Sequence, residues 1–174
     1  MKLTKLPLVA ALSLLVLSSN VWAQSTKRLI DEVNPFIGTS NFGTTNPGAV
    51  VPNGLMSITP FNVSGSLELN KFDKDKRWWS TPYTTDNKFF SGFSHVNLSG
   101  VGCPELGSII VSASAGDLDV DYTHYGSAMS EEKAHPGYYS VQLDKHKIKA
   151  EVTATQRTAV SAFTFERGGK SNIL

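Results

Sequence analysis

The sequence predicts an all-β protein, an antiparallel β-sandwich. Beyond the first residues the chain shows almost no helical periodicity, and several short segments alternate apolar and polar side chains. The connections between these segments are long and rich in glycine and proline. Many short strands joined in this way are typical of two packed antiparallel sheets. We expect the sandwich to be incomplete, since the chain ends at 171–174 in an apolar run that resembles a strand just begun.

The first 23 residues have the composition of a signal peptide. Lys2 and Lys5 precede an apolar run at 6–17, and Val21 and Ala23 supply the small residues of a cleavage site. Twelve apolar residues are too few to span a bilayer comfortably, although an uncleaved anchor is the alternative. We expect residues 24–174 to form the mature domain, exported to the periplasm or the medium without a membrane span.

The first strands follow loops. Residues 55–59 form a short apolar strand that we expect to lie between the turn at 52–54 and Pro60. Residues 62–87 are polar and aromatic in the manner of a loop, and so are residues 34–54. The apolar run 109–111 is consistent with a strand that is covered on both faces.

The clearest strands come near the end of the chain. Residues 139–143 and 148–154 alternate in period two and are separated by four residues, which predicts a hairpin. The inward side chains would be Tyr139, Val141, Leu143, Ile148, Ala150, Val152 and Ala154. A turn at 157–158 then leads to a third strand marked by Phe163 and Phe165.

Charge and cysteine content exclude several function classes. The formal net charge is +1, and the densest basic run, 71–77, alternates with Asp73 and Asp75, so no nucleic-acid footprint is present. A single cysteine excludes an intrachain disulfide. A nucleophilic Cys103 paired with His95 is less favoured than a packed cysteine.

No catalytic or metal-ligating residue is assigned within the chain. The four histidines are scattered, and no second cysteine exists for a zinc site. Asp117, Asp119 and Asp121 share one face of an extended segment and could hold Ca²⁺. We favour the other interpretation, in which they form the solvent side of an edge strand with Leu118 and Val120 pointing inward.

The segment 92–103, GFSHVNLSGVGC, carries the strongest functional signal. It combines three glycines with serine, asparagine and histidine, a mixture that suits a tight loop placed against a ligand. Sugar recognition fits best, because aromatic side chains stand in or beside the neighbouring loops. Trp78 and Trp79 could each present a flat apolar face with one N–H to a pyranose ring.

The chain resembles the N-terminal portion of glycoside hydrolase family 92, exported bacterial exo-acting α-mannosidases. Five motifs carry the resemblance in order: VNPFIGT at 33–39, PGAVVPNG at 47–54, GFSHVNLSGVGCPELG at 92–107, PGYYSVQL at 136–143 and EVTATQR at 151–157. The resemblance implies a β-sandwich joined to a C-terminal (α/α)₆ domain, with the sugar site between them. It also implies Ca²⁺-dependent hydrolysis of α-mannosides with inversion, by an acid and a base roughly 6.5–9.5 Å apart.

By that resemblance the catalytic carboxylates and the Ca²⁺ ligands belong to the C-terminal domain, outside this chain, so this chain alone would be inactive. The sandwich would contribute loops to the pocket for a mannose-containing glycan. The motif positions imply substrate contacts by Gly92, Phe93, Ser94, His95, Asn97, Ser99, Gly100, Gly102 and Cys103, with Gly54 and the turn 45–48 as weaker candidates.

Two alternatives remain open from the sequence. The chain could be a freestanding exported carbohydrate-binding module that uses the same loop without catalysis. It could also be a structural or adhesive β-domain, in which segment 92–103 would be packed and dry.

Overall fold

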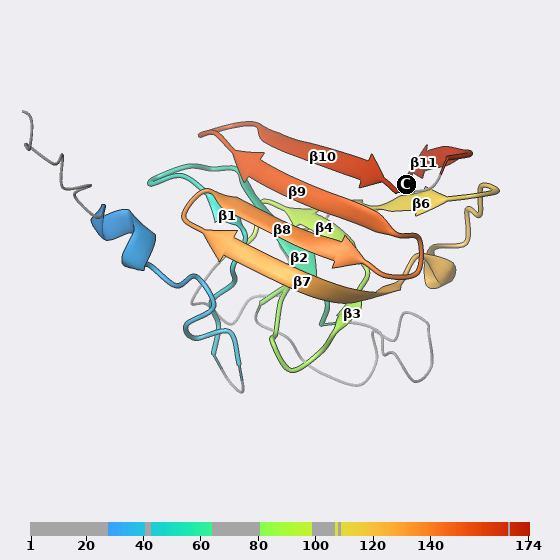
Figure 1. The fold of residues 1–174 in the computed structure, drawn as a ribbon. Helices are drawn as coiled ribbons and strands as arrows, with labels where there is room; N and C mark the ends of the chain where they lie inside the picture. The colour runs from blue at the N-terminus through green and yellow to red at the C-terminus, as the bar shows by residue number, and fades with distance from the viewer. Residues whose placement is uncertain (1–27, 41–42, 64–80, 99–106, 108, 167) are drawn as a thin grey trace, which may run out of the picture.

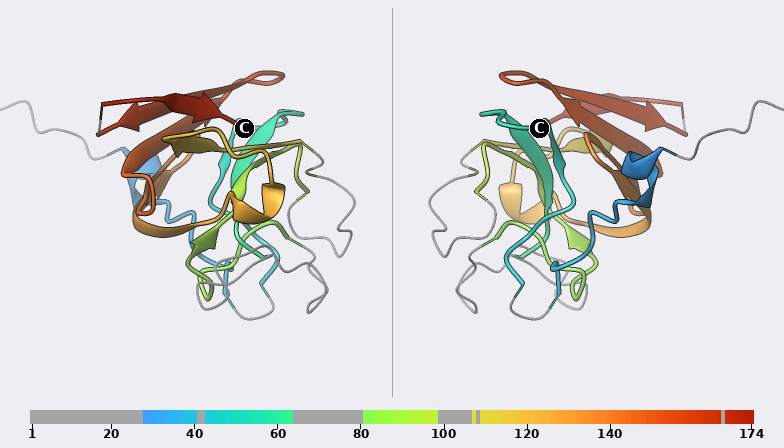
Figure 2. Two further views of the ribbon diagram at one scale, coloured as in Figure 1. Left: turned by 90° about the vertical axis from the view of Figure 1, so that its right-hand side faces the viewer. Right: turned by 90° about the vertical axis from the view of Figure 1, so that its left-hand side faces the viewer.

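The computed structural model describes residues 28–40, 43–63, 81–98, 107, 109–166 and 168–174. In this part of the chain two antiparallel sheets pack face to face, which confirms the predicted β-sandwich. Figure 1 shows the long strands of one sheet in front of the other, and Figure 2 shows the two layers from their ends. Among the described residues no helix is long and apolar enough to cross a membrane.

The first sheet has the strand order β1-β2-β4-β5, and the second has the order β10-β9-β8-β7-β3. The strands of the first are β1 (Ala49–Val50), β2 (Ser57–Phe61), β4 (Gly92–His95) and β5 (Ile110–Val111). Those of the second are β3 (Phe89–Phe90), β7 (Ser127–His135), β8 (Tyr138–Leu143), β9 (Ile148–Ala154) and β10 (Ala159–Phe165). A small third sheet pairs β6 (Ala113–Ala115) with β11 (Ser171–Ile173), and two short 3₁₀ turns are η2 (Leu29–Glu32) and η3 (Tyr122–His124).

The meander β8-β9-β10 confirms the strands that the alternating pattern predicts. Leu143 pairs with Ile148 across the hairpin, and Ala159 pairs with Ala154 across the next turn. The turn at 155–158 is closed by the backbone N–H of Thr155, which donates to the carbonyl of Thr158 at 2.8 Å. All seven side chains expected to point inward from β8 and β9 are buried.

The core lies between the two sheets, with Phe93 of β4 at its centre. Its ring meets Tyr139 of β8 edge-on at a centroid distance of 6.2 Å and Phe163 of β10 at 6.3 Å. It also meets Phe90 of β3 at 4.9 Å. Burial of one phenylalanine side chain stabilises a fold by about 1.5–3 kcal/mol, so this ring links the sheets by apolar contact.

A β-bulge in β7 changes which side chains face the core. Ser130 pairs with Gln142 and Lys133 pairs with Ser140, so two residues of β7 oppose one of β8. The bulge turns Glu132 inward, where it accepts hydrogen bonds from the hydroxyls of Tyr83 at 2.6 Å and Tyr139 at 2.9 Å. Burial, followed by the Glu132 carboxylate, raises the pKa of both phenols.

Two strand predictions are corrected at the edges of the sheets. Residues 109–111 are not covered on both faces: β5 is an edge strand, and Ile109 and Ile110 are 66% and 38% exposed. β2 does not stop before Pro60, which pairs with Phe93. Proline is tolerated there because β1 pairs only with Ser57 and Ile58, which leaves that edge of β2 open.

Residues 117–121 form no strand in the structure, contrary to the edge strand that we favoured. Leu118 and Val120 do not point inward and are 60% and 77% exposed. The segment is held by local polar contacts instead, because Asp119 accepts hydrogen bonds from the backbone N–H of Asp121 at 2.9 Å and from His124 Nδ1 at 2.7 Å.

Candidate functional site

Strand β4 contains the first four residues of the segment 92–103, so the predicted tight loop is wrong at Gly92–His95. Its side chains alternate between the two faces of the first sheet. Phe93 lies in the core with no exposed surface, so in this structure it supports the sheet from within. Ser94 lies on the opposite face and is also fully buried.

Three small hydroxyl side chains line that opposite face, and we call Ser57, Thr59 and Ser94 the hydroxyl layer. All three are buried, with at most 7% of their surface exposed. β2 places Ser57 and Thr59 on either side of the core residue Ile58, and β4 places Ser94 opposite Thr59. The outer face of this sheet is therefore polar and buried, which requires hydrogen-bond partners for each hydroxyl.

Asn97 supplies those partners at one end of the hydroxyl layer. Its side-chain oxygen accepts from the Ser94 hydroxyl at 3.0 Å, and its side-chain N–H donates to the Ser94 carbonyl at 3.0 Å. Its backbone N–H donates to the Ser57 hydroxyl at 2.7 Å. The chain reaches this position by a reversal at Val96, whose φ of 57° is unusual for a β-branched residue.

Gly107 packs against the same asparagine. It has a φ of 87°, and a Cβ added to it would lie 2.5 Å from Oδ1 of Asn97. Only glycine combines this backbone conformation with so close an approach. Ser94, near the start of the motif 92–107, and Gly107, at its end, thus both lie against Asn97.

Asn46 closes the other end of the hydroxyl layer. Its side-chain oxygen accepts from the Thr59 hydroxyl at 2.9 Å and from the backbone N–H of Gly48 at 3.3 Å. A Cβ on Gly48 would lie 1.9 Å from Oγ1 of Thr59, so this turn approaches β2 closely only because residue 48 is glycine. The weaker candidate turn 45–48 is therefore in direct contact with the layer.

His95 stands beside the hydroxyl layer at the end of β4. Its Nδ1 lies 3.1 Å from the carbonyl oxygen of Ile109. Because a carbonyl oxygen only accepts, Nδ1 carries the proton in the neutral ring and Nε2 is left as an acceptor. The imidazole is thus held in one orientation by Ile109, the residue just before β5.

The remaining predicted site residues have different outcomes. Gly54 lies beside Val51 in its own turn and beside Gln156 of the turn 155–158, and its backbone N–H donates to the Val51 carbonyl rather than to the hydroxyl layer. Ser99, Gly100, Gly102, Cys103, Trp78 and Trp79 lie outside the described residues. Substrate contact by all of these residues stays a prediction.

Sequence reasoning missed Ser57 and Thr59. The signal was present in the alternation of Ser57, Ile58 and Thr59, where the two hydroxyl residues share the face opposite an apolar one. It was overlooked because two small polar residues in a strand are ordinarily solvent-facing.

Chemically, this arrangement can hold the motif in place but offers little acid–base chemistry. The hydroxyl layer is buried and bonded to its two asparagines, and His95 is the one titratable side chain described in contact with that strand end. In the described ranges no three histidine, cysteine, aspartate or glutamate side chains lie close enough to hold a metal ion.

Comparison with known proteins gives a consistent set of relatives. Residues 32–174 match the model of the "Glycosyl hydrolase family 92 N-terminal domain". A curated protein of Arthroderma benhamiae, described as an uncharacterized secreted glycosidase, is 30% identical over 94% of this chain and 21% of its own length.

Solved structures agree with this match. A family GH92 α-mannosidase from Bacteroides thetaiotaomicron, solved with mannoimidazole, superposes with a TM-score of 0.66 at 32% identity, over 80% of this chain and 18% of that one. A family GH92 inverting mannosidase from the same species has a TM-score of 0.61 at 23% identity, over 85% of this chain and 20% of its own, and supports the fold alone. The chain thus spans about a fifth of the length of these relatives.

Proposed function

The chain belongs to glycosyl hydrolase family 92 as an N-terminal domain, and from this premise we propose that it forms the glycan-recognising part of an exported α-mannosidase. The complete protein would hydrolyse terminal α-linked mannose from glycans with inversion and would depend on Ca²⁺. The reacting carboxylates and the Ca²⁺ ligands would come from a separate C-terminal domain.

The observation that carries the proposal is the hydroxyl layer closed by Asn46 and Asn97. A sugar ring is recognised by several neutral donors and acceptors held in fixed directions, since a loose set would lose binding energy in ordering. Here the 92–107 motif is tied to β2 and β4 by hydrogen bonds of 2.7–3.0 Å through Asn97. A rigid base of this kind would fix the loop that presents its polar groups to the sugar.

Calcium, when bound in the complete protein, would supply Lewis-acid polarisation or positioning of the attacking water. The described residues offer no cluster for it, so their own role is limited to binding and orientation. His95, with Nδ1 held by Ile109, would direct Nε2 as an acceptor for a sugar hydroxyl.

The test uses the complete gene product and an aryl α-mannoside. We expect hydrolysis that EDTA abolishes and Ca²⁺ restores, with β-mannose as the first anomer in proton NMR. Asn97→Ala should lower kcat/KM about tenfold or more, because the loop loses side-chain hydrogen bonds of about 1 kcal/mol each. Asn172→Ala, on β11 outside the layer, is the matched control and should retain activity.

The outcomes separate the candidates. Retention of full kcat/KM in Asn97→Ala would remove the hydroxyl layer from substrate recognition. Binding of mannosides without any hydrolysis by the complete gene product would favour the noncatalytic carbohydrate-binding alternative. Retention of the starting anomeric configuration would contradict inversion.

A further inference from the structure

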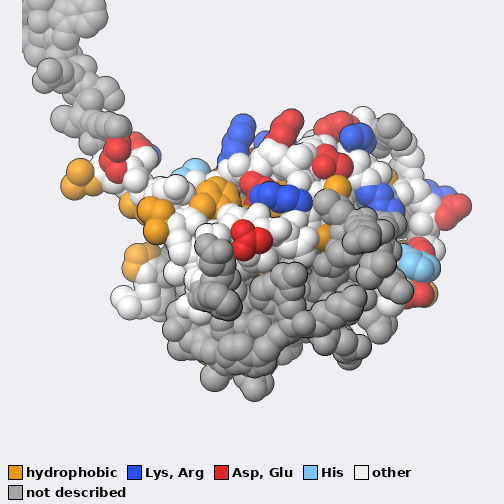
Figure 3. Space-filling view, turned by 90° about the horizontal axis from the view of Figure 1, so that it is seen from below, with side chains coloured by type: hydrophobic (Ala, Val, Ile, Leu, Met, Phe, Trp, Pro, Cys, Tyr) orange, Lys and Arg blue, Asp and Glu red, His pale blue; other side chains and the backbone are white. Residues whose placement is uncertain are grey.

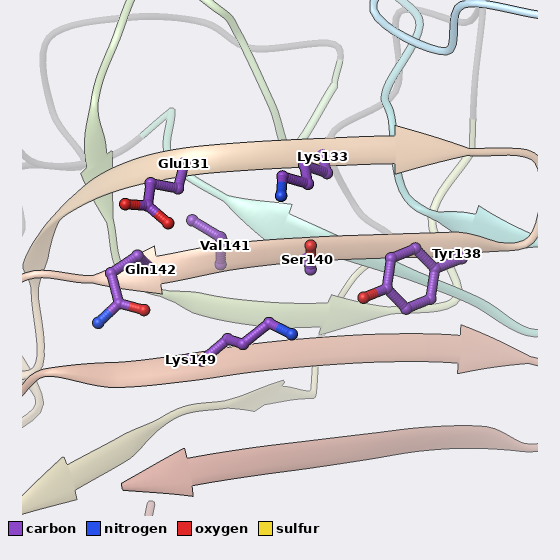
Figure 4. A pocket seen from close by; sticks show the side chains of 7 residues that line it. All are labelled: Glu131, Lys133, Tyr138, Ser140, Val141, Gln142 and Lys149. Carbon is purple, nitrogen blue, oxygen red and sulfur yellow. The ribbon is translucent and has the colours of Figure 1, made fainter. Parts of the chain in front are cut away.

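The outer face of the second sheet carries a hollow that the proposed function does not use. It is lined by side chains from β7, β8 and β9 and has a volume of about 170 Å³ (Figure 4). The lining residues are Glu131, Lys133, Tyr138, Ser140, Val141, Gln142 and Lys149. This face lies on the other side of the core from the hydroxyl layer, because the second sheet turns Tyr139 and Leu143 inward.

The hollow exists because one short side chain is surrounded by long ones. Ser140 sits in the middle strand of the three, opposite Lys133 of β7 and opposite Glu151 of β9. Tyr138 and Gln142 stand two residues away on the same face of β8. The serine therefore forms the floor, and the longer chains form the walls, as Figure 4 shows.

The floor offers an unused hydrogen-bonding group. Ser140 is only 3% exposed, and no hydrogen bond joins its hydroxyl to any described residue. Its oxygen is not among the buried atoms without a partner in the described residues, so it reaches the hollow and is accessible there. A ligand in the hollow could bond to it.

The bulge in β7 shapes one wall. Because the register shifts between Ser130 and Lys133, both Glu131 and Lys133 lie exposed on the outer face. Glu131 has a φ of 50°, a conformation that costs energy in a residue other than glycine and is often found at functional positions. Neither side chain forms an ion pair with the described residues, so one acceptor and one donor border the hollow.

The opposite wall is ordered by hydrogen bonds. The Tyr138 hydroxyl donates to Glu151 at 2.5 Å, and His135 stacks on the Tyr138 ring at a centroid distance of 4.7 Å. Lys149 forms an ion pair with Glu151 at 3.0 Å. The phenol oxygen is therefore held in place and can still accept a hydrogen bond.

The charges around the hollow select the class of ligand. Charges of both signs border the hollow: Lys149 is paired with Glu151, and Glu131 and Lys133 stand on the bulged wall. Figure 3 shows the same mixture of basic and acidic side chains over the described part of the surface seen from below. Donors and acceptors with charges of both signs suit a neutral polyhydroxyl ligand, and the volume is smaller than the roughly 300 Å³ of drug-sized pockets.

We propose that this hollow binds one neutral sugar residue of a glycan. The ring would cover Ser140 and exchange hydrogen bonds with Ser140, Lys133 and Tyr138. Such a subsite would hold a glycan chain to the outer face of the second sheet, and its assignment does not depend on the activity of the complete protein. The shallow site implies a Kd on the order of 1 mM.

The test is an NMR titration of the full chain with methyl α-D-mannopyranoside. Ser140→Val removes the hydroxyl and fills the floor with a residue that favours strands, so we expect binding to weaken about tenfold. Lys133→Met keeps the length of the side chain but removes its charged donor, so glycoside binding should weaken about fivefold. The matched control is Thr164→Val. Thr164 lies on β10, on the same outer face of the sheet but outside the hollow, so this variant should bind the glycoside as the wild type does.

Several results would overturn the assignment. One is saturable binding of sodium phosphate in place of the glycoside, and another is no glycoside binding at all. A third is a Ser140→Val variant that binds the glycoside with wild-type affinity and has an unchanged melting temperature. Asn97→Ala should leave the Ser140-dependent signals unchanged, so a failure of this subsite is distinguishable from a failure of the proposed function.

Discussion

Asn62 provides the sharpest test of how the loops are attached to the sandwich. It follows β2 and has no exposed surface, and its side chain forms hydrogen bonds with the segment 81–88. Its Nδ2 donates to the carbonyls of Thr84 at 2.7 Å and Asn87 at 2.6 Å. Its Oδ1 accepts from the backbone N–H of Thr84 at 2.8 Å. The substitution Asn62→Ala removes all three hydrogen bonds.

The magnitude follows from those bonds. Each contributes about 1 kcal/mol, and the Thr84 groups, only 4% exposed, would be left without partners at a further cost of about 1–3 kcal/mol. We expect Asn62→Ala to lower the free energy of unfolding by about 3–5 kcal/mol. At an m value of about 2 kcal/mol/M this shifts the urea midpoint by about 2 M.

The assay is urea unfolding followed by circular dichroism, with exposed Asn34→Ala as the control that should move the midpoint little. Asn62→Asp adds a check on the mechanism. It places a carboxylate against two carbonyl oxygens, which raises its pKa above the unfolded value of about 3.9. Its stability deficit relative to wild type should therefore grow as the pH rises above about 4. A loss below about 1 kcal/mol in Asn62→Ala would refute the reasoning.

Two further predictions concern the core and the hydroxyl layer. Burial, and then a neighbouring carboxylate, raises the pKa of Tyr83 and Tyr139 above the ordinary 10.0, so stability should be complete below about pH 10 and fall above it. Absorbance at about 295 nm should show these two phenols ionising only as the chain unfolds, and early titration of all five tyrosines would contradict their burial. Gly48→Ala should destabilise by about 1–3 kcal/mol, because its Cβ would lie 1.9 Å from Oγ1 of Thr59. Gly168→Ala, which meets nothing within 4 Å, should be neutral in the same thermal melt, and equal melting temperatures would disprove the clash.

Local pattern predicts best where strands that are neighbours in sequence pair with each other. The alternation of 139–143 and 148–154 identifies both strands, their hairpin and their inward faces, because a period of two and a short turn fix the register. Pro60 shows the limit of local patterns. Proline usually ends a strand, and its place inside β2 depends on β1 pairing no further than Ile58, a fact about a different segment.

The candidate site is partly predictable in the same way. The motif 92–107 draws attention to Asn97, but it predicts a tight loop where the structure has strand β4 at Gly92–His95. One partner of Asn97 is Ser57, forty positions away, so no local pattern predicts it. Phe93 stands inside the same motif and is a core residue, which only the pairing of β4 with β2 and β5 decides.

The sequence by itself determined the fold class, the family resemblance and the inward faces of β8 and β9, since these depend on residue types at short spacing. Tertiary structure alone decided that Ile109 and Ile110 lie on an edge, that the bulge turns Glu132 inward, and that Ser140 forms the floor of a hollow. The physical reason is that exposure and hydrogen-bond partnership belong to pairs of surfaces. The sequence of a strand determines only its own surface. The segment that covers this surface is determined by the packing of the whole chain.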